Sequence, residues 1–156
     1  MALANPNINY EAERLKLRSI YVNSSPQSRL KVIRQRLAQP ETGPTRLVTI
    51  VSGVEALARS LVINAKAKSA SEIKTAYSSY RDYGPDVLVE HTLKAYGKKA
   101  PSEFFSEDTW PLFREAVNFR NLIVHECTYL GQDKYPSLIQ AATEVLQTLA
   151  IIGGLD

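Results

Sequence analysis

The sequence predicts an all-α protein of about six to seven helices, two of them long and central. Apolar residues recur at helical spacing along the whole 156-residue chain. Residues with branched β-carbons are not grouped into the alternating, turn-bounded runs that indicate strands. A chain of this length suits one domain with a sizeable core. We therefore expect a single domain over residues 1–156, with a bundle core over 45–152 and an N-terminal helical elaboration over 1–40.

Proline, glycine and serine punctuate the chain and set the expected helix ends. Asn23-Ser24-Ser25-Pro26 separates the first two helices, because proline is tolerated in the first turn of a helix. Residues 39–44 form a linker, and Gly84-Pro85-Asp86 breaks the chain again. The first helix is expected to make apolar contacts through Leu15, Ile20 and Tyr21. We expect helices at about residues 9–22, 26–38, 45–66, 70–83, 86–96, 109–129 and 136–152.

The helix over 45–66 is the strongest core element, since its apolar residues form a broad stripe. That stripe comprises Leu47, Ile50, Val51, Val54, Leu57, Ala58, Leu61 and Val62. Glu55 and Arg59 lie at its edge, four residues apart in the order that favours an intrahelical ion pair. Glu55 is also expected to neutralise Arg120 if the two helices that carry these residues pack together.

The fourth and fifth helices carry aromatic and histidine side chains. Ser69-Ala70-Ser71-Glu72 predicts a capping box with Ser69 as the cap. Tyr77, Tyr80 and Tyr83 follow, and tyrosines near basic residues can stack on bases, although half-buried packing is the more common role at helical spacing. His91 lies beside Glu90 in the next helix without a partner motif, which indicates a surface histidine.

The helix over 109–129 holds the residues of greatest functional interest. One apolar arc of this helix comprises Phe113, Ala116, Val117, Ile123, Val124 and Cys127. Arg120 falls in the middle of that arc, and a long cationic side chain is rarely buried unless it is paired. A separate polar stripe comprises Arg114, Asn118, Asn121 and His125, at spacings of four, three and four. On an ideal helix the directions of Arg120 and His125 differ by ~140°.

Composition narrows the classes of function. Residues 1–99 carry 16 Lys and Arg against 8 Asp and Glu, whereas residues 100–156 carry 3 against 8, so the net charge of +3 is unevenly distributed. A basic half attracts phosphate backbones, although solvated helix faces are an equally good explanation. We expect neither a secretory signal nor a membrane span, and the single Cys127 suits the reducing cytoplasm.

Several kinds of catalytic site are excluded by residue supply and spacing. One cysteine and two distant histidines do not make a zinc site, so we expect no metal and no cofactor. The chain has no Gly-rich phosphate loop and no nucleophile elbow. Cys127 and His125 point ~200° apart on a helix and cannot form a dyad. Arg120 and His125 remain as the candidate catalytic pair.

Arg120-Asn121-Leu122-Ile123-Val124-His125 resembles the Arg-x4–6-His motif of the HEPN superfamily, with Asn121 as the polar residue that often follows the arginine. The resemblance implies a HEPN-like helical bundle that forms a homodimer, with both motifs meeting in a cleft between subunits. It also implies a metal-independent endoribonuclease of a toxin–antitoxin or phage-defence system, with RNA as substrate and an antitoxin as a further partner. Arg120 and His125 would be catalytic, and Asn121 and Glu55 would support them.

The chemistry fits these residue types. The 2′-hydroxyl of RNA can attack the adjacent phosphate if a base, an acid and a positive charge are supplied. Histidine titrates near ~6.5 and can act as base or acid, while arginine offers a planar fork to phosphate oxygens. One histidine cannot play both roles in one displacement, so a symmetric cleft with two histidines gives the dimer a chemical purpose. Because Arg120 and His125 diverge, either the helix unwinds near His125 or the two groups approach the phosphate from different directions or subunits.

Other interpretations remain open. A non-catalytic HEPN-like module that binds nucleotide or RNA, or that scaffolds a larger complex, is the main alternative. A plain helical interaction domain is the third, with Arg120 as a core arginine paired with Glu55 and His125 as a polar residue favoured by the helix dipole. Glu126, beside the motif, would repel phosphate.

Overall fold

The computed structural model describes residues 3–128 and 131–156, and in these residues the chain is helical without strands. The all-α prediction is confirmed, and each of the seven expected helices is present. An additional one-turn helix begins at Pro101, between two of the expected helices, so the described residues form eight α-helices and one 3-10 turn. The bounds are α1 Tyr10–Asn23, α2 Pro26–Leu37, α3 Gly43–Lys66, α4 Ala70–Tyr80, α5 Pro85–Ala95, α6 Pro101–Phe104, α7 Thr109–Glu126, η1 Gln132–Lys134 and α8 Tyr135–Ile152.

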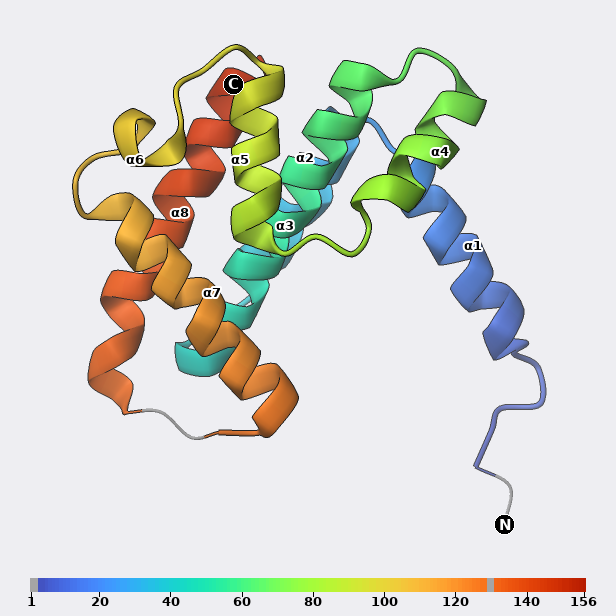
Figure 1. Cartoon of the computed structure of the whole chain (residues 1–156). Coiled ribbons are helices and arrows are strands. Elements are labelled where there is room, and N and C mark those ends of the chain that lie inside the picture. Colours follow the sequence, from blue (N-terminus) through green and yellow to red (C-terminus); the bar gives the residue numbers. More distant parts are fainter. Residues whose placement is uncertain (1–2, 129–130) are drawn as a thin grey trace.

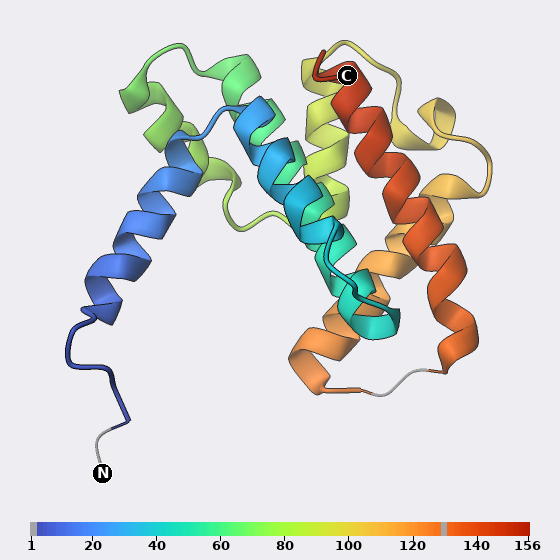
Figure 2. The same ribbon diagram turned by 180° about the vertical axis from the view of Figure 1, so that it is seen from behind.

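Helix α3 is the centre of the molecule. It packs against α2, α4, α5, α7 and α8, and Figures 1 and 2 show α5 on one side of it and α2 on the other. Its length and composition would also suit a membrane span, but two thirds of its most apolar window (67%) is buried inside the protein. Two long central helices were expected. Helix α3 is long and central, whereas the second long helix of that expectation, α7, pairs with α8 at one side of the bundle.

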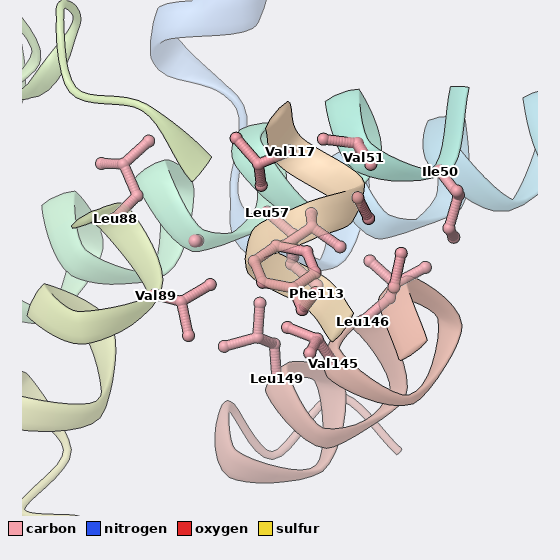
Figure 3. Packing of buried hydrophobic residues seen from close by; sticks show 14 of the residues in the cluster. Ile50, Val51, Leu57, Leu88, Val89, Phe113, Val117, Val145, Leu146 and Leu149 are labelled. Carbon is pink, nitrogen blue, oxygen red and sulfur yellow. The ribbon is translucent and has the colours of Figure 1, made fainter. Parts of the chain in front are cut away.

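The core fills the space between α3, α5, α7 and α8. Figure 3 shows Phe113 of α7 surrounded by aliphatic side chains of these helices, including Leu57 of α3 and Leu149 of α8. Phe113, Leu57 and Leu149 are fully buried. Burying a side chain of this kind contributes ~1.5–3 kcal/mol, so this cluster fixes how α7 lies on α3.

Helix ends follow the predicted chemistry at α4 and differ at α7. The Ser69 hydroxyl accepts the Glu72 backbone N–H at 3.3 Å, and the Glu72 carboxylate accepts the Lys68 N–H at 2.8 Å. Helix α7 ends at Glu126, earlier than the predicted end at Tyr129, which itself lies outside the described residues. Cys127 has a φ of 51°, a left-handed conformation that stops the helix while its N–H bonds the Leu122 carbonyl.

The N-terminal helices divide into a packed and an exposed one. Leu30 and Ile33 of α2 are buried against α3 and belong to the core. Helix α1 has no buried residue, and Figure 1 shows it reaching away from the bundle beside α4. The predicted apolar contacts of Leu15 and Ile20 are wrong, since both are more than half exposed, while Tyr21 packs edge-on against Tyr77. Periodicity predicted the helix but could not show that the bundle ends before reaching it.

Candidate functional site around Arg120

Helix α7 carries Arg120 and His125, and its first half is anchored in the core. Phe113, Ala116 and Val117 are buried, and the Thr109 hydroxyl donates to the Glu144 carboxylate of α8 at 2.7 Å. The apolar arc of α7 leaves the core in the second half of the helix, where Ile123 is only partly buried and Val124 is 51% exposed. Arg120 therefore lies at the point where the packed part of α7 gives way to the projecting part.

The Arg120 side chain lies against α3 and is only 13% exposed. Its Nη2 atom lies 3.9 Å from Oε1 of Glu55, so the predicted pairing of these two residues is present. Its Nη1 donates to the Ser52 hydroxyl in a long hydrogen bond of 3.4 Å. Its Nε is buried and has no hydrogen-bond partner within the described part of the chain. A guanidinium has five N–H donors, so Arg120 is held loosely and keeps unused donors.

Arg59 provides a direct comparison, because it shares Glu55 with Arg120. Its Nη2 lies 3.7 Å from the same Glu55 oxygen, as the spacing of four residues predicted. Its other donors reach the carbonyls of Tyr80, Arg81 and Tyr83 and the Tyr21 hydroxyl, at 3.1–3.4 Å. Arg59 thus joins α3 to the α4–α5 connection and to α1. It is a satisfied structural arginine, whereas Arg120 is not.

His125 is exposed in the last turn of α7 and makes no hydrogen bond to another residue in the described ranges. The helix stays regular through Glu126, so unwinding near His125 is excluded as the way to bring it beside Arg120. The ~140° divergence expected for residues five apart on an unbroken helix therefore stands. Asn121 is partly buried and lies on the His125 side of the helix. Within one chain, the structure does not bring the two motif residues together.

A hollow of about 240 Å³ between α2 and α3 extends the basic surroundings of Arg120. Ser52, which accepts the Arg120 hydrogen bond, also lines this hollow together with Arg29 and Arg36 of α2. The guanidinium of Arg29 lies 4.2 Å from the centre of the Tyr21 ring. Burial lowers the pKa of Arg29, and Tyr21 partly offsets this by raising it. The guanidinium nevertheless stays charged.

Sequence reasoning missed Ser52. Ser52 lies three residues before Glu55, on the same face of α3, so helical spacing could have indicated it. No sequence signal shows that α2 crosses α3 at Ser52, because that depends on the packing of Ile33 against Gly53. Glu55 is one carboxylate near two guanidinium groups, those of Arg59 and Arg120, which leaves the region positive.

The aromatic residues noted in the sequence have packing roles. Tyr80 is buried, and the Lys66 ammonium lies 5.4 Å from the centre of its ring. Tyr83 stacks on His91 with ring centres 5.2 Å apart and planes 5° apart. Tyr80 is thus closed to a base, while one face of the Tyr83 ring is covered by His91 and the residue stays 40% exposed. Among the described residues, no group of three or more His, Cys, Asp or Glu is placed to hold a metal ion.

Comparisons with known proteins found no relative of this chain. No protein-family model matches the chain, and neither a curated protein nor a solved structure matches it.

Proposed function

We propose that this protein is a metal-independent endoribonuclease of HEPN type that cuts RNA at a homodimer cleft. The Arg120-to-His125 motif is the basis of the resemblance, and the state of Arg120 is the observation that carries the proposal. A buried polar atom without a partner calls for an explanation. The Arg120 guanidinium is held only by the Glu55 ion pair and one long bond to Ser52, so it keeps free N–H donors for an anion that arrives at its exposed part, and a shift of the side chain would be needed to bring the buried Nε to that anion.

The comparison with Arg59 separates this function from a purely structural one. Arg59 of α3 and Arg120 of α7 are both largely buried, and they share the Glu55 carboxylate. The remaining N–H groups of Arg59 donate hydrogen bonds to backbone carbonyls and a hydroxyl, as expected for a structural arginine. Arg120 has one long bond only. A phosphate near its exposed edge would gain charge-assisted hydrogen bonds that the folded chain leaves open.

The reaction we propose is a transesterification, in which a phosphate of the RNA backbone is transferred from the 5′-oxygen of the next nucleotide to the neighbouring 2′-oxygen. A histidine removes the 2′-hydroxyl proton, and the 2′-oxygen attacks the adjacent phosphorus. The bond from phosphorus to the 5′-oxygen breaks, and a second acid protonates that oxygen. The products are a 2′,3′-cyclic phosphate and a 5′-hydroxyl, with no oxidant, reductant or water consumed. Arg120 stabilises the charge on the phosphorane, and the arginines of α2 raise the local positive potential.

A homodimer supplies the second histidine and resolves the divergence of the motif. On an unbroken α7 the His125 side chain points away from the Arg120 of its own chain. In a symmetric pair, His125 of one subunit can face Arg120 of the other. The projecting end of α7 offers an apolar surface for this contact, with Val124 half exposed, Ile123 partly buried and Cys127 exposed.

The experiment that tests the proposal measures cleavage of a fluorogenic single-stranded RNA in the presence of a metal chelator. We expect wild-type protein to cut, and His125→Ala and Arg120→Ala each to lower kcat by ~10² or more. An RNA with a single 2′-deoxy sugar at the cut site should resist. His91→Ala is the matched control, because His91 is the other histidine of the chain and should leave the rate unchanged.

Circular dichroism and thermal melts must show that each variant is folded. The proposal is wrong if metal-independent cleavage survives both changes in folded protein, or if wild-type protein cuts no RNA. A toxin or defence role follows from the same resemblance, and it predicts growth arrest on expression in a bacterial cytoplasm that is relieved by the His125→Ala change or by a cognate antitoxin.

The second candidate is a non-catalytic HEPN-like module that binds nucleotide or RNA or scaffolds a complex. The Glu55–Arg120 ion pair favours it, because a carboxylate already neutralises part of the guanidinium charge. In that case RNA binds to the wild-type protein without being cut. Measurement of RNA binding beside cleavage therefore separates the two functions.

A further inference from the structure

A second basic cavity, of about 560 Å³, lies at the opposite end of α7 from His125. It is bounded by α5, the connection from α5 to α6, and the first turns of α7; Figure 1 shows this connection and α6 above the start of α7. Its charged lining consists of Lys94, Lys98, Lys99 and Arg114 with a single carboxylate, Glu90. The buried Trp110 contributes to its wall. Four cations against one anion make the cavity strongly positive.

These cations are available to a ligand. Lys94, Lys98, Lys99 and Arg114 are all exposed, and none of them takes part in a salt bridge within residues 3–128 and 131–156. A cavity lined mainly by one sign of charge concentrates counter-ions. Lysine and arginine side chains neutralise the phosphates of a nucleic-acid backbone. The lining therefore suits a phosphate backbone better than an isolated apolar ligand.

Arg114 connects this cavity to the motif. It belongs to the polar stripe of α7 that continues through Asn118 and Asn121 to His125. In the regular helix these four residues fall within a ~60° sector, and Arg114 and His125 are ~16 Å apart at ~1.5 Å per residue. Amide and guanidinium side chains along such a stripe can donate to phosphate and sugar oxygens.

We propose that single-stranded RNA lies along this stripe, with its phosphates in the cavity at one end and its reacting phosphate near His125 at the other. The proposal rests on the proposed ribonuclease function for the reacting end, whereas the cavity and stripe are independent observations. At ~3.4 Å per stacked nucleotide, the ~16 Å path corresponds to about five nucleotides, within the site sizes of single-strand binders. A dinucleotide at His125 is too short to reach the cavity.

The test compares a Lys94→Gln/Lys98→Gln/Lys99→Gln triple variant with a control that loses the same charge elsewhere. Lys16, Lys68 and Lys74 are exposed lysines outside the cavity, and their change to Gln makes the matched control. Binding is measured by fluorescence anisotropy with a labelled oligouridine of about 12 nucleotides, using full-length chains that carry His125→Ala so that the RNA stays intact. We expect the cavity variant to bind at least about tenfold more weakly than the control at 0.1 M salt.

Salt dependence gives a second readout. Each phosphate contact to a single strand contributes about 0.7 to the slope of log affinity against log salt, so loss of three contacts should lower that slope by about two. In chains that retain His125, the cavity variant should raise KM for long RNA and leave kcat and dinucleotide cleavage unchanged.

The outcomes separate this inference from the proposed function. If wild-type protein binds the oligonucleotide through the cavity but never cuts RNA, the nuclease proposal fails, while the proposed RNA path along the cavity and stripe stands. If the cavity variant binds RNA as well as the control does, or if wild-type protein does not bind the oligonucleotide, the proposed RNA path is wrong.

Discussion

Glu55 lies between two guanidinium groups, 3.7 Å from that of Arg59 and 3.9 Å from that of Arg120. Removal of either arginine leaves the carboxylate with the other, so loss of the ion pair alone does not distinguish them. The remaining hydrogen bonds do. Arg59 has four further contacts to protein oxygens, and Arg120 has one long bond to Ser52.

This difference predicts unequal effects on stability. Arg59→Ala removes the bonds to the carbonyls of Arg81 and Tyr83 and one of the two to the Tyr80 carbonyl, and we expect it to lower the free energy of unfolding by ~3 kcal/mol. Arg120→Ala should cost ~1 kcal/mol, since one weak bond is lost and Glu55 stays paired. Urea denaturation followed by circular dichroism measures both. Equal losses for the two variants would mean that Arg120 is a structural arginine, and this would remove the main support for its proposed catalytic role.

At the scale of single residues, the sequence contains part of this site but not its most informative feature. The four-residue spacing of Glu55 and Arg59 predicts their pair, and the position of Arg120 on an apolar arc predicts that it needs a partner. The number of donors that Arg120 leaves unfilled depends on the distance between α7 and α3. That distance is set by the burial of Phe113 and its neighbours, which no spacing along one helix contains.

At the scale of elements, the crossing of α2 and α3 positions the basic hollow beside Arg120. A Cβ atom placed on Gly53 would lie 2.9 Å from Cγ2 of Ile33, a buried side chain, so glycine allows the close approach. Ser52 precedes Gly53 and lines the hollow with Arg29 and Arg36. The separation of the two helices therefore also sets the distance between these arginines and the Ser52 hydroxyl.

Gly53→Ala is expected to destabilise the protein although alanine favours helix. The intrinsic gain is ~1 kcal/mol, whereas forcing a methyl group into a packed contact costs ~1–3 kcal/mol, so a net loss of up to ~2 kcal/mol should follow. Ile33→Ala removes the atom that the methyl group meets. In a double-mutant cycle measured by urea denaturation, Gly53→Ala should therefore cost less, or stabilise, in the Ile33→Ala background. Equal costs in both backgrounds would show that the crossing is not limited by this contact.

Element identity followed from the sequence more fully than element environment did. Periodicity and caps predict all seven of the expected helices, and Ser69 caps α4 as expected, although Glu72 accepts the N–H of Lys68 in place of that of Ser69. The one-turn α6 is too short to show periodicity, and the left-handed Cys127 that ends α7 is not a residue typical of that conformation. The exposure of α1 could not be predicted, because an apolar face needs a surface to cover it and the sequence does not show where the bundle ends.

At the scale of the whole molecule, α7 relates the two basic regions to each other. Arg120 faces α3 beside the hollow of α2, while the stripe from Arg114 to His125 lies on a different side of the same helix and begins at the cavity of α5 and α6. One chain therefore presents Arg120 and His125 in different directions. A complete site of the kind proposed requires two copies of α7, so activity should depend on how subunits are combined.

Subunit mixing tests this dependence directly. Light scattering should first show a dimer at micromolar concentration, and Val124→Glu at the exposed end of α7 should shift it toward monomer. Wild-type and His125→Ala chains are then mixed in equal amounts, allowed to exchange and assayed at constant total protein. If one cleft uses both histidines, as base and as acid, only wild-type pairs are active and the rate falls to about a quarter of the wild-type value. If each subunit works alone, the rate falls to about half. A value near half from a confirmed, fully exchanged dimer would contradict the use of both histidines in one cleft.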